Sequence, residues 1–501
     1  MLQIIETINT AVNNFIWGVP AMVCIFGVGL YLSIRTNFLQ IRKFPYAIKT
    51  TLGRIFRKRD ASDGAITPFQ AVCTALAATV GTGNIAGVAG AIAIGGPGAI
   101  FWMWVSALFG MCTKYAEVTL AVHYREINAN GELVGGPMYY IKNGLSKKWH
   151  WLAYLFAAFG VLTVFGTGNA TQVNTITTAI NSALLNYNVI SESAVSTSNL
   201  IIGIIIAILI AMILLGGIKR IGHVTEKLVP FMALLYILLG LGVILLNIQN
   251  VPAVFASIFR GAFQPRAVTG GIVLSMFTSL KKGVSRGIFS NEAGLGTGSI
   301  AHACADTKKP VKQGFFGIFE VFVDTFVVCT ITALTVLVSG EWTSGATNAT
   351  LALNVFTHNF GVFGTVVLTL IMVVFSVTTS GGWYAYYEVV LRHLAKNHPK
   401  VKKYLLLMFK YFYAVPPFFL TLYLIYVGDL SIWTLVDITS GIPTFVNVAV
   451  ILILSGQYFK LLKDYKARYM HIGQVDPDMA IFYEDKPEVK AALEKEKAAQ
   501  K

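Results

Sequence analysis

The sequence carries little charge, and this scarcity bounds the class of protein. Only 13% of its 501 residues are Asp, Glu, Lys or Arg, whereas soluble domains carry roughly 25%. Hydrophobic residues make up 55% of the chain. Runs of about 20 apolar residues, the length that crosses a bilayer core, occur repeatedly. The sequence therefore predicts a polytopic membrane protein surrounded by lipid bilayer.

Other features are missing as well. The chain has only five cysteines, most of them in apolar runs, so disulfide bonds are not expected. The N-terminus lacks the basic segment and cleavage site of a signal peptide, so none is expected. There is no G-x-x-x-x-G-K-[ST] motif, which argues against ATP-driven transport. Without a convergent set of nucleophile, base and metal ligands, neither an enzyme nor an organic cofactor is predicted.

The pattern of apolar runs predicts eleven membrane spans. The loop after the first span, from Arg35 to Asp60, contains eight Lys and Arg, so the positive-inside rule makes it cytoplasmic. The N-terminus then lies outside and the C-terminus inside. With this orientation, all of the 39 basic residues except Arg260 and Arg266 belong to the cytoplasmic side. Topology thus explains the net charge of +15, and nucleic acid is not expected as a partner. The spans are 15–34, 66–95, 98–123, 149–182, 200–218, 228–248, 268–300, 314–339, 360–391, 404–427 and 430–457.

Two of these spans are interrupted. In 66–95 the sequence "GTGN" breaks an apolar run, and 268–300 changes after Leu280 to lysines and a glycine-rich half. The two spans hold equivalent places in two sets of five helices that begin on opposite sides of the membrane. Broken helices at matching places of inverted repeats indicate the binding site of a secondary transporter. The chain then divides into an N-terminal helix with a basic loop (1–65), a first repeat (66–248), a second, inverted repeat (268–457) and a cytoplasmic tail (458–501).

Physical chemistry gives the first break a function. Unpaired backbone groups in hydrocarbon cost several kcal/mol each unless they are buried in protein or line a cavity. The half-helix after Asn84 presents free N–H groups and a positive dipole end, which suit a carboxylate. The half ending near Val80 presents carbonyls, which suit a small cation. The alternative is that Gly83-x-x-x-Gly87 only allows close helix packing, and both uses can hold on different faces.

Four motifs carry a family resemblance: "ATVGTGNIAGVAGAI", "GGPMYYI", "FSNEAGLGTGSIAHA" and "TTSGGWYAYYE". They resemble the signatures of the alanine-or-glycine:cation symporter family of the amino acid–polyamine–cation superfamily, over about 15–457. The resemblance implies an all-α fold of two inverted five-helix repeats, similar to the leucine transporter, with one extra N-terminal helix. It also implies import of alanine or glycine with Na⁺, or less often H⁺, across a prokaryotic inner (plasma) membrane.

The resemblance further implies two sets of site residues. A substrate carboxylate would be held at the first break, an aromatic wall or gate would stand before the second, and further side chains would line the pocket. These substrate residues are Thr82, Gly83, Asn84, Gln172, Phe277, Thr379, Trp383 and Tyr387. The shared Na⁺ site of the fold would use the carbonyls of Ala77 and Val80 and the hydroxyls of Ser376, Thr379 and Ser380.

The residues themselves support part of this assignment. Ser376, Thr379 and Ser380 stand at i, i+3 and i+4, which places them on one helix face. Hard cations take oxygen ligands. The alternative is that these hydroxyls only bond to carbonyls of their own helix. The bulk of Trp383 and Phe277 predicts a small substrate, because steric rejection limits side-chain size, but it does not choose between alanine and glycine.

Ionisable residues within the spans are functional candidates by default. Lys114 and Glu117 could form an inward pair, and Glu320 and Asp324 stand at i and i+4; these residues and Asp437 could serve a gate, a proton step or an ion pair. Glu292 is expected to act as a gate or brace rather than as a substrate ligand. An amino-acid channel or facilitator without ion coupling is the alternative function.

Overall fold

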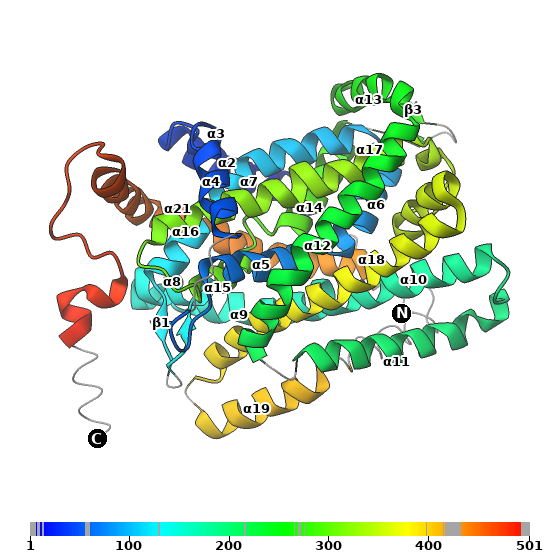
Figure 1. The fold of residues 1–501 in the computed structure, drawn as a ribbon. Helices are drawn as coiled ribbons and strands as arrows, with labels where there is room; N and C mark the ends of the chain where they lie inside the picture. Colours follow the sequence, from blue (N-terminus) through cyan, green and yellow to red (C-terminus); the bar gives the residue numbers. More distant parts are fainter. Residues whose placement is uncertain are drawn as a thin grey trace.

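The computed structural model is almost entirely α-helical over the residues it describes, and two short strand pairs are its only sheet within them (Figure 1). The described residues are 7, 11–12, 15–55, 61–128, 131–214, 217–264, 266–268, 272–274, 276–396, 398–413, 415 and 432–491.

The helices follow one another with short connections. They are α2 Val19–Arg35, α3 Leu39–Arg42, α4 Phe44–Ile55, α5 Pro68–Thr79, α6 Val88–Gly95, α7 Gly98–His123, α8 Pro137–Gly144, α9 Trp151–Thr163, α10 Thr171–Asn186, α11 Val195–Leu214, α12 Gly217–Leu246, α13 Val251–Phe263, α14 Met276–Asn291, α15 Gly298–Ala303, α16 Pro310–Val321, α17 Thr330–Val338, α18 Asn348–Leu394, α19 Pro399–Phe412 and α21 Ile432–Met470. The antiparallel strand pairs are β1 Glu126–Ile127 with β2 Leu133–Val134, and β3 Arg266–Val268 with β4 Ile272–Leu274.

Six helical stretches among the described residues are long and apolar enough to cross a bilayer, and the bent pair α5–α6 makes a seventh. The other four predicted spans fall on α2, α7, α14–α15 and α19, which do not meet that test; part of 404–427 lies outside the described residues. The chain therefore has the helices of an integral membrane protein, while the count of eleven and the orientation stay predictions.

The first predicted break is confirmed. Helix α5 begins with a capping box between Thr67 and Gln70, and it ends where Val80 turns to extended backbone (φ −81°, ψ 93°). A π-helical segment, Gly83–Gly87, then leads into α6, and the two helices meet at a bend of 50°. The amide of Gly81 donates to Asn84 Oδ1 at 2.8 Å, so a side chain replaces the helical acceptor that the break removes.

The second break lies further along the chain than predicted. Helix α14 runs through Leu280 and the lysines that follow it and ends at Asn291, so a break after Leu280 is wrong. The chain leaves the helix where Glu292, Gly294 and Gly296 have positive φ values of 54°, 97° and 89°. Glycine adopts such angles without steric cost, so the break follows the glycines and not the lysines. The predicted start of this span at 268 is also wrong, because the β3–β4 hairpin occupies that region.

Helix α18 packs against several helices at the centre of the bundle. It packs against α5, α10 and α12, while α7 packs between α14 and α16. Its chain is kinked at Gly361, where the backbone is not helical (φ 57°, ψ −142°). Helix α13 lies between two predicted spans in the sequence and was not itself predicted; it packs against α7 at the upper edge of the view in Figure 1. The two broken helices therefore meet α18 and α7 inside the bundle.

A backbone bridge joins the two broken helices near their ends. Ile66, just before α5, donates its amide to the carbonyl of Cys304 at 3.1 Å, and its own carbonyl accepts from the amide of Asp306 at 2.7 Å. The guanidinium of Arg125 donates to the carbonyls of Ala305 and Thr307 at 2.6 and 3.0 Å. The start of α5 and the segment after α15 are thus fixed to each other.

Candidate functional site

The end of α5 lies directly on one face of α18. The hydroxyl of Thr379 donates to the carbonyl of Val80 at 3.4 Å, and the indole N–H of Trp383 donates to the carbonyl of Ala78 at 3.2 Å. A Cβ at Gly81 would lie 2.4 Å from Thr379 Oγ1, so this approach requires glycine. The structure brings the predicted residues of the first break and of α18 into contact.

Two more of the predicted cation ligands, Ser376 and Ser380, stand on α18 close to Thr379 in the chain. The hydroxyls of Ser376 and Ser380 are buried and have no hydrogen-bond partner among the described residues. They therefore do not bond to their own helix carbonyls, in contrast to Thr378 nearby, whose hydroxyl donates to Val374 O at 2.9 Å. Buried polar groups are normally satisfied, so these two oxygens fit a ligand that supplies positive charge.

The carbonyl side of the predicted cation site comes from the break itself. In a continuous helix the amide of Gly81 would donate to the carbonyl of Ala77. Here that amide donates to Asn84 Oδ1 instead. The last carbonyls of α5 are thus directed at α18, as the Val80–Thr379 contact shows. Neutral carbonyl and hydroxyl oxygens of this kind suit a hard monovalent cation.

Gln172 meets the break from another side. Its Oε1 accepts from both the hydroxyl and the amide of Thr82, at 2.7 and 3.3 Å. Its Nε2 donates to the carbonyl of Thr167 at 3.1 Å, in a π-helical segment, Val164–Ala170, that precedes α10. The expected contact of Gln172 with the unwound segment is present, and it depends on a second irregular helix that no sequence pattern revealed.

Trp383 and Tyr387 differ in position. Trp383 is fully buried, and a Cβ at Gly168 would lie 2.5 Å from its Cβ and Cγ, so the indole packs directly on backbone. Tyr387 lies one turn further and packs against Phe409 of α19, with ring centroids 3.7 Å apart. The structure therefore places Trp383 at the break and Tyr387 at the contact of α18 with α19.

The aromatic ring beside the first break is Phe289 and not Phe277. Phe277 lies at the start of α14 with 44% of its surface exposed. Phe289 is buried, and a Cβ at Gly83 would lie 2.7 Å from its Cε1. The choice of Phe277 depended on a break after Leu280. Counting back from the glycines of "NEAGLG" would have pointed to Phe289.

Asp324 is the acidic residue at the junction of the two breaks. It is fully buried, and its Oδ1 accepts from Asn84 Nδ2 at 2.6 Å. Its Oδ2 accepts from the hydroxyls of Ser290 and Thr325 at 2.8 and 2.9 Å. The sequence marked Asp324 only as an ionisable residue within a span. All these donors are neutral, so the carboxylate suits a cationic group of the cargo.

A second group of charged residues lies behind the break between α14 and α15. The ammonium of Lys114 lies 2.9 Å from a carboxyl oxygen of Glu320, while Glu117 accepts from the amide of Gly294 at 2.9 Å. Lys114 therefore forms its ion pair with Glu320. The predicted ion pair between Lys114 and Glu117 is wrong. The side chain of Asp437 lies outside the described residues.

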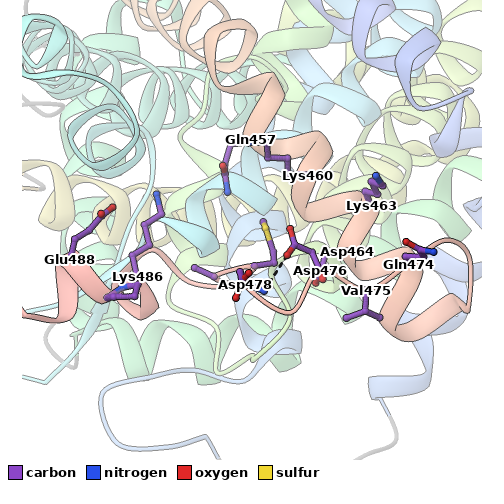
Figure 2. A pocket seen from close by; sticks show the side chains of 13 residues that line it. Gln457, Lys460, Lys463, Asp464, Gln474, Val475, Asp476, Asp478, Lys486 and Glu488 are labelled. Carbon is purple, nitrogen blue, oxygen red and sulfur yellow. Dashed lines mark hydrogen bonds between the residues drawn. The ribbon is translucent and has the colours of Figure 1, made fainter.

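A cavity of about 620 Å³ lies apart from this site (Figure 2). Its walls come from the end of α21, with Lys460 and Asp464, and from the segment after it, with Asp476 and Lys486. That segment folds back on the bundle, where the carbonyl of Ile481 lies 2.8 Å from His123 Nδ1. No predicted site residue lines this cavity.

Comparison with known proteins identifies the family. The model of the "Sodium:alanine symporter family" matches residues 2–477. The chain belongs to this family. The predicted resemblance is confirmed, and the family is one of transporters and not of enzymes. As a member of this family, the protein is a sodium-coupled amino-acid symporter.

Named relatives differ in their amino acid. The symporter is 42% identical over 401 residues to the sodium/alanine symporter AgcS of Methanococcus maripaludis, covering 78% of this chain and 84% of that protein. It is 37% identical over 492 residues to the "probable sodium/glutamine symporter GlnT" of Bacillus subtilis, covering 97% and 95%. Among solved structures it is similar to MhsT in complex with L-phenylalanine, with a TM-score of 0.59, 13% identity and coverage of 80% and 90%. That likeness shows the leucine-transporter-like fold.

Proposed function

We propose that this symporter imports small neutral amino acids, alanine or glycine, driven by an inward Na⁺ gradient. The observation that carries the proposal is the contact of Thr379 with the Val80 carbonyl, flanked by the unsatisfied hydroxyls of Ser376 and Ser380. These groups and the carbonyl of Ala77 would bind Na⁺ between α5 and α18. The ion would then strengthen the direct contacts that already join α18 to the end of α5.

The amino acid would bind on the other side of the same break. Its carboxylate would bind at the segment Thr82–Asn84. The hydroxyl of Thr82 and the side-chain amide of Asn84 would turn from Gln172 and Asp324 to donate to it, and Gln172 would position Thr82 for this exchange. Its ammonium group would lie toward Asp324, which supplies the opposite charge. Binding both groups of the zwitterion at helix breaks leaves no large polar group of the substrate unpaired.

Close packing supports a small side chain. The indole of Trp383 lies on Gly168, and the ring of Phe289 lies on Gly83. We propose that these two rings, and not Phe277, bound the space for the substrate side chain. Tyr387 would support Trp383 from the α19 side. The glutamine-named relative makes glutamine the substrate that competes with this assignment.

The remaining features of the topology are part of the proposal. We infer eleven spans with the N-terminus outside and the C-terminus inside, a first repeat at 66–248, an inverted repeat that begins with α14 and ends near residue 457, and a place in a prokaryotic plasma membrane. The distribution of basic residues supports the orientation. The bend in α5–α6 and the break between α14 and α15 at matching places support the repeats.

Transport by purified protein in sealed vesicles tests the function. Vesicles with an inward Na⁺ gradient should accumulate labelled alanine above its external concentration. The accumulation should vanish when the Na⁺ gradient is collapsed, and a proton gradient alone should not restore it. Saturable uptake that only equilibrates alanine, with or without Na⁺, would instead show a facilitator. Counterflow with L-alanine, D-alanine, glycine, serine and glutamine then ranks the substrates.

A further inference from the structure

Five charged or ionisable side chains behind the second break form what we term the buried cluster. All are fully buried and come from three helices and the break; they are Lys114, Glu117, Glu292, His302 and Glu320. The ammonium of Lys114 and the ring of His302 each lie 2.9 Å from a different oxygen of Glu320. The proposed function uses none of these residues.

The charges of the buried cluster do not balance when every carboxyl is ionised. Lys114 is its only lysine or arginine, against the three carboxyls of Glu117, Glu292 and Glu320. The ring of His302 lies between Glu320 and Gln313, with its Nδ1 3.0 Å from Gln313 Nε2. Even a positive charge on this ring would leave one of the three carboxylates buried without compensation, at a cost of several kcal/mol.

Hydrogen bonds show which carboxyl is least suited to be an anion. Glu320 is paired with Lys114. One oxygen of Glu117 accepts from Gly294 N at 2.9 Å and from Asn447 Nδ2 at 2.7 Å, and such N–H donors stabilise a carboxylate. The contact of Glu292 is with the hydroxyl of Thr297 at 2.6 Å. A hydroxyl can equally accept a hydrogen bond from a protonated carboxyl.

The surroundings of Glu292 point the same way. Its Oε1, like Oε2 of Glu117, is buried and has no hydrogen-bond partner among the described residues, but the other oxygen of Glu292 meets a hydroxyl and not the N–H donors that Glu117 has. Besides Lys114 of α7, the groups that act on it electrostatically are Glu320 of α16, Asp324 of the π-helical segment after α16, and Tyr386 of α18. Only the lysine among these carries positive charge.

Glu292 also occupies the point where the helix breaks. It follows the last residue of α14 and has a left-handed backbone, with φ at 54°, which a non-glycine residue rarely adopts. The carbonyl of the preceding Asn291 accepts from Lys114 Nζ at 3.2 Å. The amide of Gly294, two residues later, donates to Glu117. A change of charge on Glu292 would therefore act on the break directly.

We propose that Glu292 is a proton-binding site. Its carboxyl holds a proton while the break is buried as described here, and the proton leaves to water when the break opens during transport. The oxygen–hydrogen bond of the carboxyl breaks, the carboxylate keeps the electron pair, and no other covalent bond changes. The inference rests on the proposed function in that a transport cycle opens the break, and it adds a proton step that Na⁺ coupling does not require.

The transport test compares Glu292→Gln with a matched control. Glutamine has the shape of a protonated glutamate, so the variant keeps the buried arrangement. Glu126→Gln changes a carboxyl that pairs with Lys142 in the β1–β2 region. At saturating Na⁺ and alanine, the wild-type uptake rate should fall by about tenfold per pH unit on the acidic limb, because the transport cycle continues only after one proton has left the opened break.

The expected results separate the variants. Glu292→Gln should transport slowly at a rate that does not vary with pH, whereas Glu126→Gln should keep the wild-type profile. A wild-type pH profile in Glu292→Gln, or a flat profile in the wild type, overturns the proposal.

Infrared spectroscopy of the purified protein keeps the test independent of transport. The wild type and Glu126→Gln should show the C=O band of a buried protonated carboxyl at neutral pH, and Glu292→Gln should lose it. Retention of that band in Glu292→Gln overturns the proposal even if the variant does not transport. If the band behaves as expected but Na⁺ does not drive uptake, the proposed function fails and the proton site stands.

Discussion

Replacing Thr379 with alanine tests the assignment of the cation site most directly. The change removes one oxygen from the proposed cation site between α5 and α18 and leaves the backbone in place. A hydrogen bond or contact to a charged group contributes about 1.5–3 kcal/mol. Since about 1.4 kcal/mol corresponds to tenfold in affinity, the Na⁺ concentration for half-maximal uptake should rise roughly 10- to 100-fold. The maximal rate at high Na⁺ should change little.

Thr378 provides a matched control for this change. It is the neighbouring residue with the same side chain, and it is also buried. Its hydroxyl bonds to carbonyls of its own helix at 2.9 and 3.0 Å. Thr378→Ala removes no proposed Na⁺ ligand, so it should shift the half-saturating Na⁺ concentration by no more than about threefold, which corresponds to roughly 0.7 kcal/mol.

The assay is initial-rate uptake of labelled alanine into vesicles, at saturating alanine and varied Na⁺, with the membrane potential held constant. Equal Na⁺ shifts in the two threonine variants would refute the cation-site assignment. So would a Thr379→Ala variant in which only the half-saturating alanine concentration changes. Gln172→Ala should do the reverse, weakening alanine binding more than Na⁺ dependence.

Two further substitutions test the walls of the substrate pocket. Gly168→Ala should raise the half-saturating alanine concentration at least tenfold, because its Cβ would meet the adjacent indole at 2.5 Å; Gly160→Ala, whose Cβ would have its nearest neighbour at 3.9 Å, should match the wild type in the same uptake assay. Phe289→Ala should admit larger amino acids such as glutamine in counterflow, whereas Phe277→Ala should not, and the opposite ranking would restore Phe277 as the pocket wall.

The sequence predicted the first break because its signal is local. "GTGN" interrupts an apolar run, and two glycines with a side-chain acceptor three residues on suffice to end and restart a helix. The second break was misplaced because the lysines after Leu280 look like an interruption. A helix tolerates lysine well, whereas only residues that can adopt positive φ end it here, at Glu292, Gly294 and Gly296.

Contacts between distant segments were harder to predict. The i, i+3, i+4 pattern predicted that Ser376, Thr379 and Ser380 share a face of the helix, and the structure shows the contact of one of them, Thr379, with Val80 at the end of α5. No periodicity could reveal that Asp324 would meet Asn84, because the two residues are far apart in the chain. The same is true of the pairing of Lys114 with Glu320.

The backbone bridge at Ile66 has a mechanical consequence. It joins the start of α5 to the segment after α15, which follows the second break. The proposed cation carbonyls lie at the other end of α5. Two short half-helices joined by two backbone hydrogen bonds are expected to tilt together, since a tilt of one alone would break both bonds. An ion arriving at one half-helix would then move the other half-helix without any contact between ion and amino acid. Arg125 donates to the carbonyl of Ala305 at this bridge. Its guanidinium carbon also lies 4.7 Å from the ring centroid of Phe482, so the folded-back C-terminal segment contacts the residue that fixes the shared end of the two half-helices.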